Sequence, residues 1–269
     1  MTFLDHLHAA QSATGSRLCV GLDPDPERLP APLRGRPLPE AVLSFCVAIT
    51  EATAPYTAAF KPNLAFFEAL GPDGADVLAE VVGRIPEGRL VVADGKRGDI
   101  GNTAARYATA LYDRLGADAA TVAPYMGRDA LLPFLQHEGR CAFVLAATSN
   151  PSAADLQQLV IDGEPFYRRV ARMAVEAGRE APGTAGLVVG ATRPSLLAEL
   201  REAHPETPFL VPGVGAQGGE AAAVLAANAG GPMLVNASRS VLYASDGADF
   251  ADAAARAAQA LAAALPYPD

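Results

Sequence analysis

The sequence predicts a (β/α)₈ barrel. Eight short apolar runs, typical of buried parallel strands, alternate with stretches long enough to form helices. No linker and no shift in composition divides the 269 residues, so we expect a single domain over residues 1–269. A doubly wound parallel sheet is the alternative, but eight strand–helix alternations favour the barrel.

The predicted strands are continuously apolar rather than alternating, as expected when both faces of a sheet are covered. In chain order they are RLCVGLD (17–23), AAFKPN (58–63), RLVVADGK (89–96), AATVAPY (119–125), CAFVLAAT (141–148), GLVVGAT (186–192), FLVPGVG (209–215) and MLVNASR (233–239). Stretches rich in Ala, Leu, Glu and Arg predict helices between them. Examples are residues 39–53, 102–116, 164–178 and 249–265.

The composition excludes several classes of protein. A formal net charge of −9 without a Lys/Arg-rich run argues against a nucleic-acid partner, although a few local cations could still hold a small anion. Cys19, Cys46 and Cys141 are odd in number and far apart, so we expect reduced cysteines in a cytosolic protein. The sequence shows neither a signal peptide nor an apolar run of about 18 residues. We therefore expect a soluble cytoplasmic protein without a membrane partner.

Polar side chains stand at the C-terminal ends of the predicted strands. In a (β/α)₈ barrel these ends meet at one mouth, where the active sites of this fold lie. The residues concerned are Asp23, Lys61, Asp94, Lys96, Ser149, Asn150, Gln217, Ser238 and Arg239. The sequence thus predicts one common site.

Alternating charges in VVADGKRGDIGNT (91–103) suggest acid–base chemistry. Asp94 and Lys96 project from the same face if the strand persists, whereas Asp99 lies beyond it. Lys61 precedes a proline, which keeps it extended at its strand end. Such a cluster can hold a proton ready for a carbanion, or press a carboxylate against a negative group of a substrate. The alternative is a solvated charged turn. Asp23 could bind a hydroxyl or sugar, or else cap a turn.

The glycine-rich stretch VPGVGAQGG (211–219) contains G-x-G-x-x-G, but it lies near the seventh strand and lacks the acidic residue of a dinucleotide site. Loops after barrel strands 7 and 8 often bind phosphate, which assigns Gln217 and Arg239 to a phosphate group. Ser149 and its neighbours suit a polar heterocycle or a helix cap. The four histidines have no metal-ligand spacing, so we expect no metal site.

These motifs together resemble the orotidine 5'-phosphate decarboxylase family, specifically its longer bacterial subgroup, type 2. The matching segments span nearly the whole chain. They are GLD (21–23), FKPN (60–63), DGKRGDIGNT (94–103), TSNPS (148–152), VPGVGAQGG (211–219) and ASRS (237–240). Two departures from the commoner short form are Gly101 in place of a proline and Ser238–Arg239 in place of Gly-Arg.

The resemblance implies cofactor-independent decarboxylation of orotidine 5'-monophosphate (OMP) to uridine 5'-monophosphate (UMP), the last step of de novo UMP synthesis. It implies a homodimer with shared active sites and a catalytic tetrad. The tetrad is Lys61, Asp94, Lys96 and Asp99, with Lys96 protonating C6 and Asp99 crossing to the partner subunit. The implied substrate-binding residues are Asp23, Ile100, Thr103, Ser149, Pro212, Gln217 and Arg239, with Ile100 and Thr103 in the neighbouring subunit's site.

Two other functions remain open from the sequence. One is another enzyme of the same barrel group, a 3-keto-L-gulonate 6-phosphate decarboxylase or a hexulose-phosphate synthase, in which the acidic residues would bind magnesium. The other is a phosphate-ligand binder without catalytic activity. The crowded Lys/Asp set argues against a binder, because binding alone does not require it.

Overall fold

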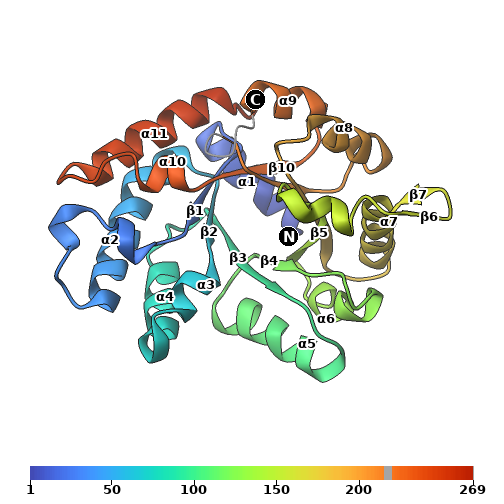
Figure 1. Ribbon diagram of the computed structural model, residues 1–269, viewed down its shortest axis with the longest axis horizontal. Coiled ribbons are helices and arrows are strands. Elements are labelled where there is room, and N and C mark those ends of the chain that lie inside the picture. Colours follow the sequence, from blue (N-terminus) through green and yellow to red (C-terminus); the bar gives the residue numbers. More distant parts are fainter. Residues whose placement is uncertain (215–219, 269) are drawn as a thin grey trace.

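Eight parallel strands close into a barrel in the computed structural model, which describes residues 1–214 and 220–268 (Figure 1). The strands follow one another around the barrel in the order β1-β10-β9-β8-β5-β4-β3-β2. Their bounds are β1 (Leu18–Leu22), β2 (Ala59–Pro62), β3 (Leu90–Arg97), β4 (Ala119–Val122), β5 (Cys141–Ala147), β8 (Thr184–Val189), β9 (Phe209–Pro212) and β10 (Met233–Ala237). Each lies within one of the eight predicted runs, apart from the first two residues of β8 and the last residue of β3, and the predicted fold class is confirmed.

Helices surround the barrel (Figure 1). They are α1 (Phe3–Thr14), α2 (Leu38–Thr53), α3 (Leu64–Glu68), α4 (Gly74–Gly83), α5 (Gly101–Ala108), α6 (Leu132–Leu135), α7 (Phe166–Arg179), α8 (Pro194–Ala203), α9 (Ala221–Asn228), α10 (Arg239–Leu242) and α11 (Phe250–Ala264). Short 3₁₀ turns occur at Pro26–Arg28, Ala31–Leu33, Ala54–Tyr56, Gly71–Asp73, Arg128–Ala130 and Pro151–Asp155. No described helix is both long and apolar enough to cross a membrane.

Two of the predicted helices differ from the structure. The helix expected over residues 102–116 is α-helical only to Ala108 and then widens into a π-helix, Thr109–Arg114. The helix expected from residue 164 begins at Phe166, because Glu164–Pro165 forms strand β7, paired with β6 (Val160–Ile161). Pro165 favours an extended conformation at the residue before it. The β6–β7 hairpin projects from the barrel beside α7 (Figure 1).

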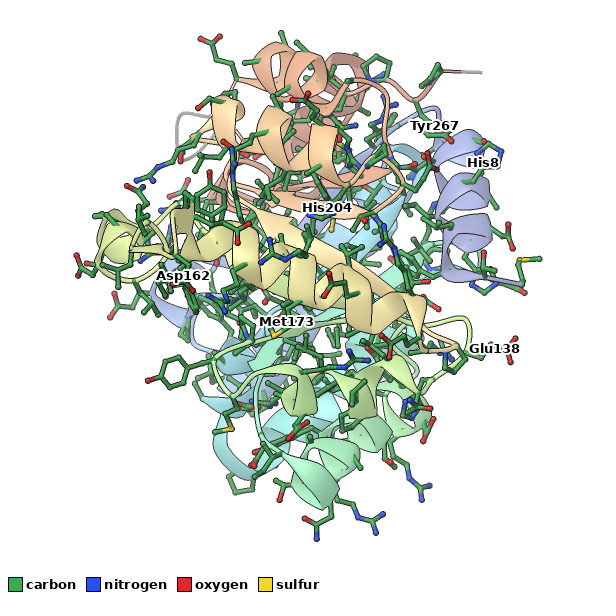
Figure 2. The ribbon with its side chains drawn as sticks, turned by 90° about the vertical axis from the view of Figure 1, so that its right-hand side faces the viewer. His8, Glu138, Asp162, Met173, His204 and Tyr267 are labelled. Atoms are coloured by element: carbon green, nitrogen blue, oxygen red, sulfur yellow. The ribbon has the colours of Figure 1, made fainter. Side chains whose placement is uncertain are left out.

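Helix α1 closes the N-terminal end of the barrel. Its Phe3 is fully buried and meets the Phe143 ring of β5 edge-on, with ring centroids 5.9 Å apart. The side chain of Gln11 donates a hydrogen bond to the carbonyl of Met233 at the start of β10. Figure 2 shows His8 of α1 beside Tyr267 near the C-terminus, and these two side chains share a 2.6 Å hydrogen bond. The C-terminal ends of the strands lie at the opposite end of the barrel, its mouth.

The apolar interior gives way to polar residues toward this mouth. Val92 of β3 packs in the interior cluster with α1, and Asp94 follows two positions later on the same strand. Lys61 and Thr121 likewise stand two positions beyond interior residues of β2 and β4. Because side chains two apart share a strand face, the barrel directs these polar groups into one layer.

Candidate active site

Asp94 lies at the centre of the charged cluster. Its Oδ2 accepts a hydrogen bond from Nζ of Lys61 and its Oδ1 accepts one from Nζ of Lys96, both at 2.6 Å. Asp94 and Lys61 are buried, with 7% and 4% of their surfaces exposed. Half of the Lys96 side chain is accessible from outside. The structure therefore brings together three members of the predicted tetrad, with one ammonium at depth and one at the surface.

Both buried groups are held in their charged forms. Burial raises the pKa of Asp94, but the positive charges of Lys61 and Lys96 outweigh this effect and leave the pKa well below 3.8. Burial lowers the pKa of Lys61, but the Asp94 and Asp23 carboxylates outweigh it and leave the pKa above 10.5. A carboxylate and an ammonium thus persist here at neutral pH.

The end of β3 is irregular where the cluster forms. Ala93 pairs with Ala120 and Arg97 pairs with Val122, so three residues of β3 stand opposite Thr121 alone. Lys96, within this bulge, has a φ of +44°, in the left-handed region that non-glycine residues seldom adopt. Bulges of this kind redirect side chains next to active sites. Here the side chains of Asp94 and Lys96, both within the bulge, meet in the charged cluster.

Asp23 follows β1 and lies near Lys61, whose pKa its charge helps to raise. Its backbone carbonyl accepts a hydrogen bond from the Tyr243 hydroxyl at 2.8 Å. Its side-chain Oδ1 is buried without a hydrogen-bond partner among the described residues. Buried polar atoms usually have a partner, so this oxygen is suited to receive a hydroxyl of a ligand.

The residues expected to serve a neighbouring subunit do not join the cluster. Asp99 accepts a hydrogen bond from the adjacent Ile100 N–H at 2.8 Å, and the described residues show no ion pair between Asp99 and Lys61 or Lys96. Ile100 is 54% exposed, and Thr103 is exposed in the first turn of α5. All three side chains therefore lie apart from the charged cluster of their own chain.

The remaining predicted residues lie on three other strand ends. Ser149 follows β5 and packs so closely on Gly190, after β8, that a Cβ at Gly190 would come within 2.9 Å of Ser149. Pro212 ends β9, and Arg239 opens α10 with an exposed side chain. Gln217 lies outside the described residues.

Three polar residues at the mouth were missed by the sequence predictions. Thr121 of β4 donates a 2.9 Å hydrogen bond to Asp94 Oδ1. Asn236 of β10 is buried, and its Oδ1 has no partner within the described part of the chain. Gln157 binds both the N–H and the hydroxyl of Thr148 at the end of β5. A polar residue inside an apolar strand was the available signal for Thr121 and Asn236.

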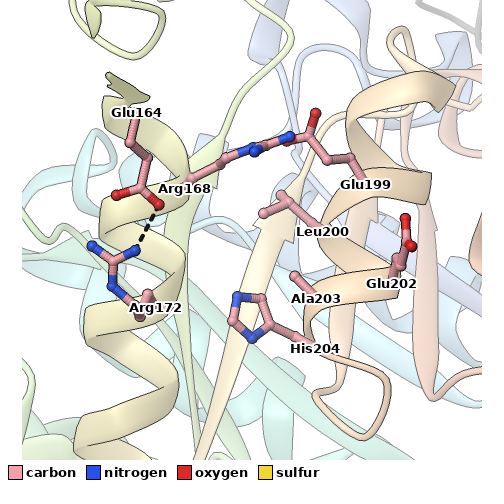
Figure 3. Close-up of a pocket in the computed structure, with 8 residues that line it drawn as sticks. All are labelled: Glu164, Arg168, Arg172, Glu199, Leu200, Glu202, Ala203 and His204. Carbon is pink, nitrogen blue, oxygen red and sulfur yellow. Dashed lines mark hydrogen bonds and ion pairs between the residues drawn. The ribbon is translucent and has the colours of Figure 1, made fainter. Parts of the chain in front are cut away.

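A cavity of 410 Å³ lies elsewhere, between α7 and α8 (Figure 3). Glu164 pairs with Arg172 at 2.6 Å, and Glu199 pairs with Arg168, so the arginines are already neutralised. In the described part of the chain, no three His, Cys, Asp or Glu side chains form a group suited to a metal ion. The charged cluster at the barrel mouth is therefore the candidate active site.

Comparison with known proteins gives one consistent result. A model of the "Orotidine 5'-phosphate decarboxylase / HUMPS family" matches residues 16–254. A protein of Roseiflexus castenholzii named orotidine 5'-phosphate decarboxylase is 49% identical over 265 residues, covering 97% of this chain and 96% of that protein. A protein of the same name from Variovorax paradoxus is 47% identical over 272 residues, covering 98% of both chains.

Comparison with solved structures indicates the same family. The structure of Leishmania donovani OMP decarboxylase has a TM-score of 0.83 and 39% identity to this chain, covering 98% of each chain. The family match includes β1 through β10 and every charged residue of the cluster. The chain belongs to the orotidine 5'-phosphate decarboxylase / HUMPS family, which confirms the resemblance predicted from its motifs.

Proposed function

We propose that this protein decarboxylates OMP to UMP and CO₂, the last step of de novo UMP synthesis. The observation that carries the proposal is the buried Asp94 carboxylate held between two ammonium groups at the barrel mouth. Full-length relatives that bear the decarboxylase name support it. In the reaction the bond from C6 to the carboxylate carbon breaks, its electron pair stays on C6, and CO₂ leaves. C6 then takes a proton.

Lys96 supplies that proton in the proposed mechanism. Its ammonium is accessible at the mouth, whereas that of Lys61 is buried. Asp94 lies beside the departing carboxylate, and because its pKa is lowered it stays charged there. Ammonium groups fixed in advance around the developing carbanion stabilise the transition state more than the ground state.

Asp23 and Lys61 bind the ribose hydroxyls in this account. The unpartnered buried oxygen of Asp23 and its position near Lys61 support the assignment. Ser149 recognises the pyrimidine from the end of β5. Pro212, Gln217 and Arg239 bind the phosphate in this account, at the C-terminal side of the last two barrel strands, where this fold commonly binds phosphate. Binding energy from the phosphate then orders the site around the reacting ring.

The active protein is a homodimer with shared sites in this account, and Asp99, Ile100 and Thr103 act in the partner's site. Large apolar side chains are exposed on the segments that follow β3 and β4, where a solvent-facing surface is usually polar. They are Ile100, Tyr107, Tyr125 and Met126. A contiguous exposed apolar patch marks an interaction surface, and in this account these four side chains form one at the dimer interface. We also place the protein in the cytoplasm, because its three cysteines are buried and free.

Purified protein incubated with OMP in the presence of EDTA tests the proposed function. We expect the pyrimidine absorbance to change as UMP forms, at the same rate with and without EDTA. The reason is that both oxygens of Asp94 already bind ammonium groups rather than facing an open cation site. Unchanged OMP would contradict the proposal. Turnover of a sugar phosphate that EDTA abolishes would instead support the magnesium-dependent relatives of the same barrel group.

A further inference from the structure

We propose that Thr121 is a positioning residue for this reaction, whose hydroxyl fixes Asp94 and Lys96 relative to each other. The inference rests on the proposed function, because it assigns Thr121 a part in the same chemistry. Thr121 lies in β4 and is 2% exposed. Its hydroxyl contacts the Asp94 carboxylate and the backbone N–H of Lys96, the two residues placed at the reacting carbon.

The directions of the two hydrogen bonds are determined by chemistry. Asp94 is ionised and can only accept, so the Thr121 hydroxyl donates its proton to Asp94 Oδ1, at 2.9 Å. The backbone N–H of Lys96 can only donate, and Thr121 Oγ1 accepts it at 2.9 Å. The hydroxyl cannot rotate away from either partner without losing a bond. A single oxygen thereby fixes both ends of the β3 bulge.

The bulge explains why a hydroxyl is needed at this position. Three β3 residues face Thr121, so the regular ladder supplies no partner in β4 for the Lys96 N–H. Lys96 also has a strained φ of +44°, which persists only if its surroundings hold it. The Thr121 side chain takes the place of the missing ladder bond and holds Lys96 in this conformation.

The position of the reactive ammonium follows from this contact. Lys96 Nζ binds the same Asp94 Oδ1 that receives the Thr121 hydroxyl. Backbone, ammonium, carboxylate and hydroxyl therefore form one closed ring of contacts. Without the hydroxyl, the Lys96 backbone is released and the ammonium moves away from its place beside C6. Displacements of about 1 Å can cost about 100-fold in rate.

The test compares Thr121→Val, which keeps the shape and removes the hydroxyl, with Thr121→Ser, which keeps the hydroxyl. We expect kcat for OMP to fall roughly 10- to 100-fold in Thr121→Val while KM changes less than about threefold. Thr121→Ser should remain within about threefold of the wild-type kcat. Thr53→Val is the matched control, because it removes a buried hydroxyl that donates to the Ile49 carbonyl far from the site.

Hydrogen exchange of the Lys96 amide gives a readout that does not depend on turnover. We expect this amide to be protected in wild type and in Thr121→Ser, and to exchange at least about tenfold faster in Thr121→Val. Thr121→Ala gives the same comparison if the valine variant does not fold.

A folded hydroxyl-free variant with wild-type kcat and amide protection would overturn the inference, as would a serine variant as impaired as valine. Wild-type protein inactive on OMP would instead refute the proposed function, even if the Lys96 amide responded to Thr121 as expected. The two failures are thus distinguishable.

Discussion

Asp94 and Lys61 form a buried ion pair, and burial alone works against both charges. Pairs of this kind are weak contributors to stability, because desolvation offsets much of their attraction. The presence of this buried pair at the barrel mouth is consistent with a catalytic role, because charges that cost folding stability can stabilise a reaction. Removing one partner of the pair leaves the other charge buried without a counter-ion, and this destabilises the folded protein strongly.

The pH dependence of stability should report this pair. The folded-state pKa of Asp94 is lowered, so its contribution is complete above pH 3.8 and is lost as pH falls below that value. The folded-state pKa of Lys61 is raised, so the contribution of Lys61 to folding stability is complete below pH 10.5 and is lost as pH rises above that value. Stability from the pair is therefore constant between these limits.

Urea unfolding of the Asp94→Asn variant tests the loss of stability expected at acidic pH. We expect the variant to be about 3 kcal/mol less stable than wild type at pH 7, since it leaves Lys61 buried without its main partner. The difference should shrink by about 2 kcal/mol between pH 5 and pH 2.5, because the Asp94 carboxyl takes up a proton in the unfolded wild type but stays ionised in the folded protein, and the variant has no such carboxyl. A difference that stays constant over this range would contradict the lowered pKa of Asp94.

Some residues of the candidate site could be predicted from the sequence and others could not. Lys61, Asp94 and Lys96 were predictable, because charged side chains are out of place at the end of an apolar strand. Thr121 was not, because threonine is an ordinary strand residue whose hydroxyl only gains significance from its partners. The open oxygen of Asp23 was likewise visible only once its surroundings were known.

At the scale of elements, strand positions were predicted well and irregularities were not. Continuous apolar runs identify strands covered on both faces, and here they located all eight strands of the barrel. The β3 bulge depends on the register between two strands, which a single sequence does not define. The π-helix Thr109–Arg114, which buries Leu111 and Tyr112, interrupts a stretch whose sequence predicts a regular α-helix. Long-range packing determines such details.

At the scale of the whole molecule, the proposed dimer makes the site depend on two chains. The tetrad is divided: Lys61, Asp94 and Lys96 meet within one chain, whereas Asp99 stands apart beside exposed apolar residues. A closed two-fold dimer would place each Asp99 near the other chain's mouth. This assignment comes from the family resemblance and stays a prediction.

Mixing two inactive variants tests the shared site. In a heterodimer of Lys96→Ala and Asp99→Ala, one site has its own Lys96 and receives an intact Asp99 from the other chain. With free exchange of subunits, about a quarter of wild-type activity should return. Sedimentation should show dimers for wild type and both variants. Confirmed heterodimers without any recovery would place Asp99 outside the shared site.

The central claim is that Lys96 donates the proton in an OMP decarboxylase, and one side-by-side measurement tests it. Turnover of OMP is measured for wild type and for Lys96→Ala, together with binding of UMP by calorimetry. We predict that wild type forms UMP, and that Lys96→Ala loses at least about 1,000-fold in kcat while still binding UMP measurably. Near-normal turnover by Lys96→Ala would contradict the account, because the proton would then come from another group.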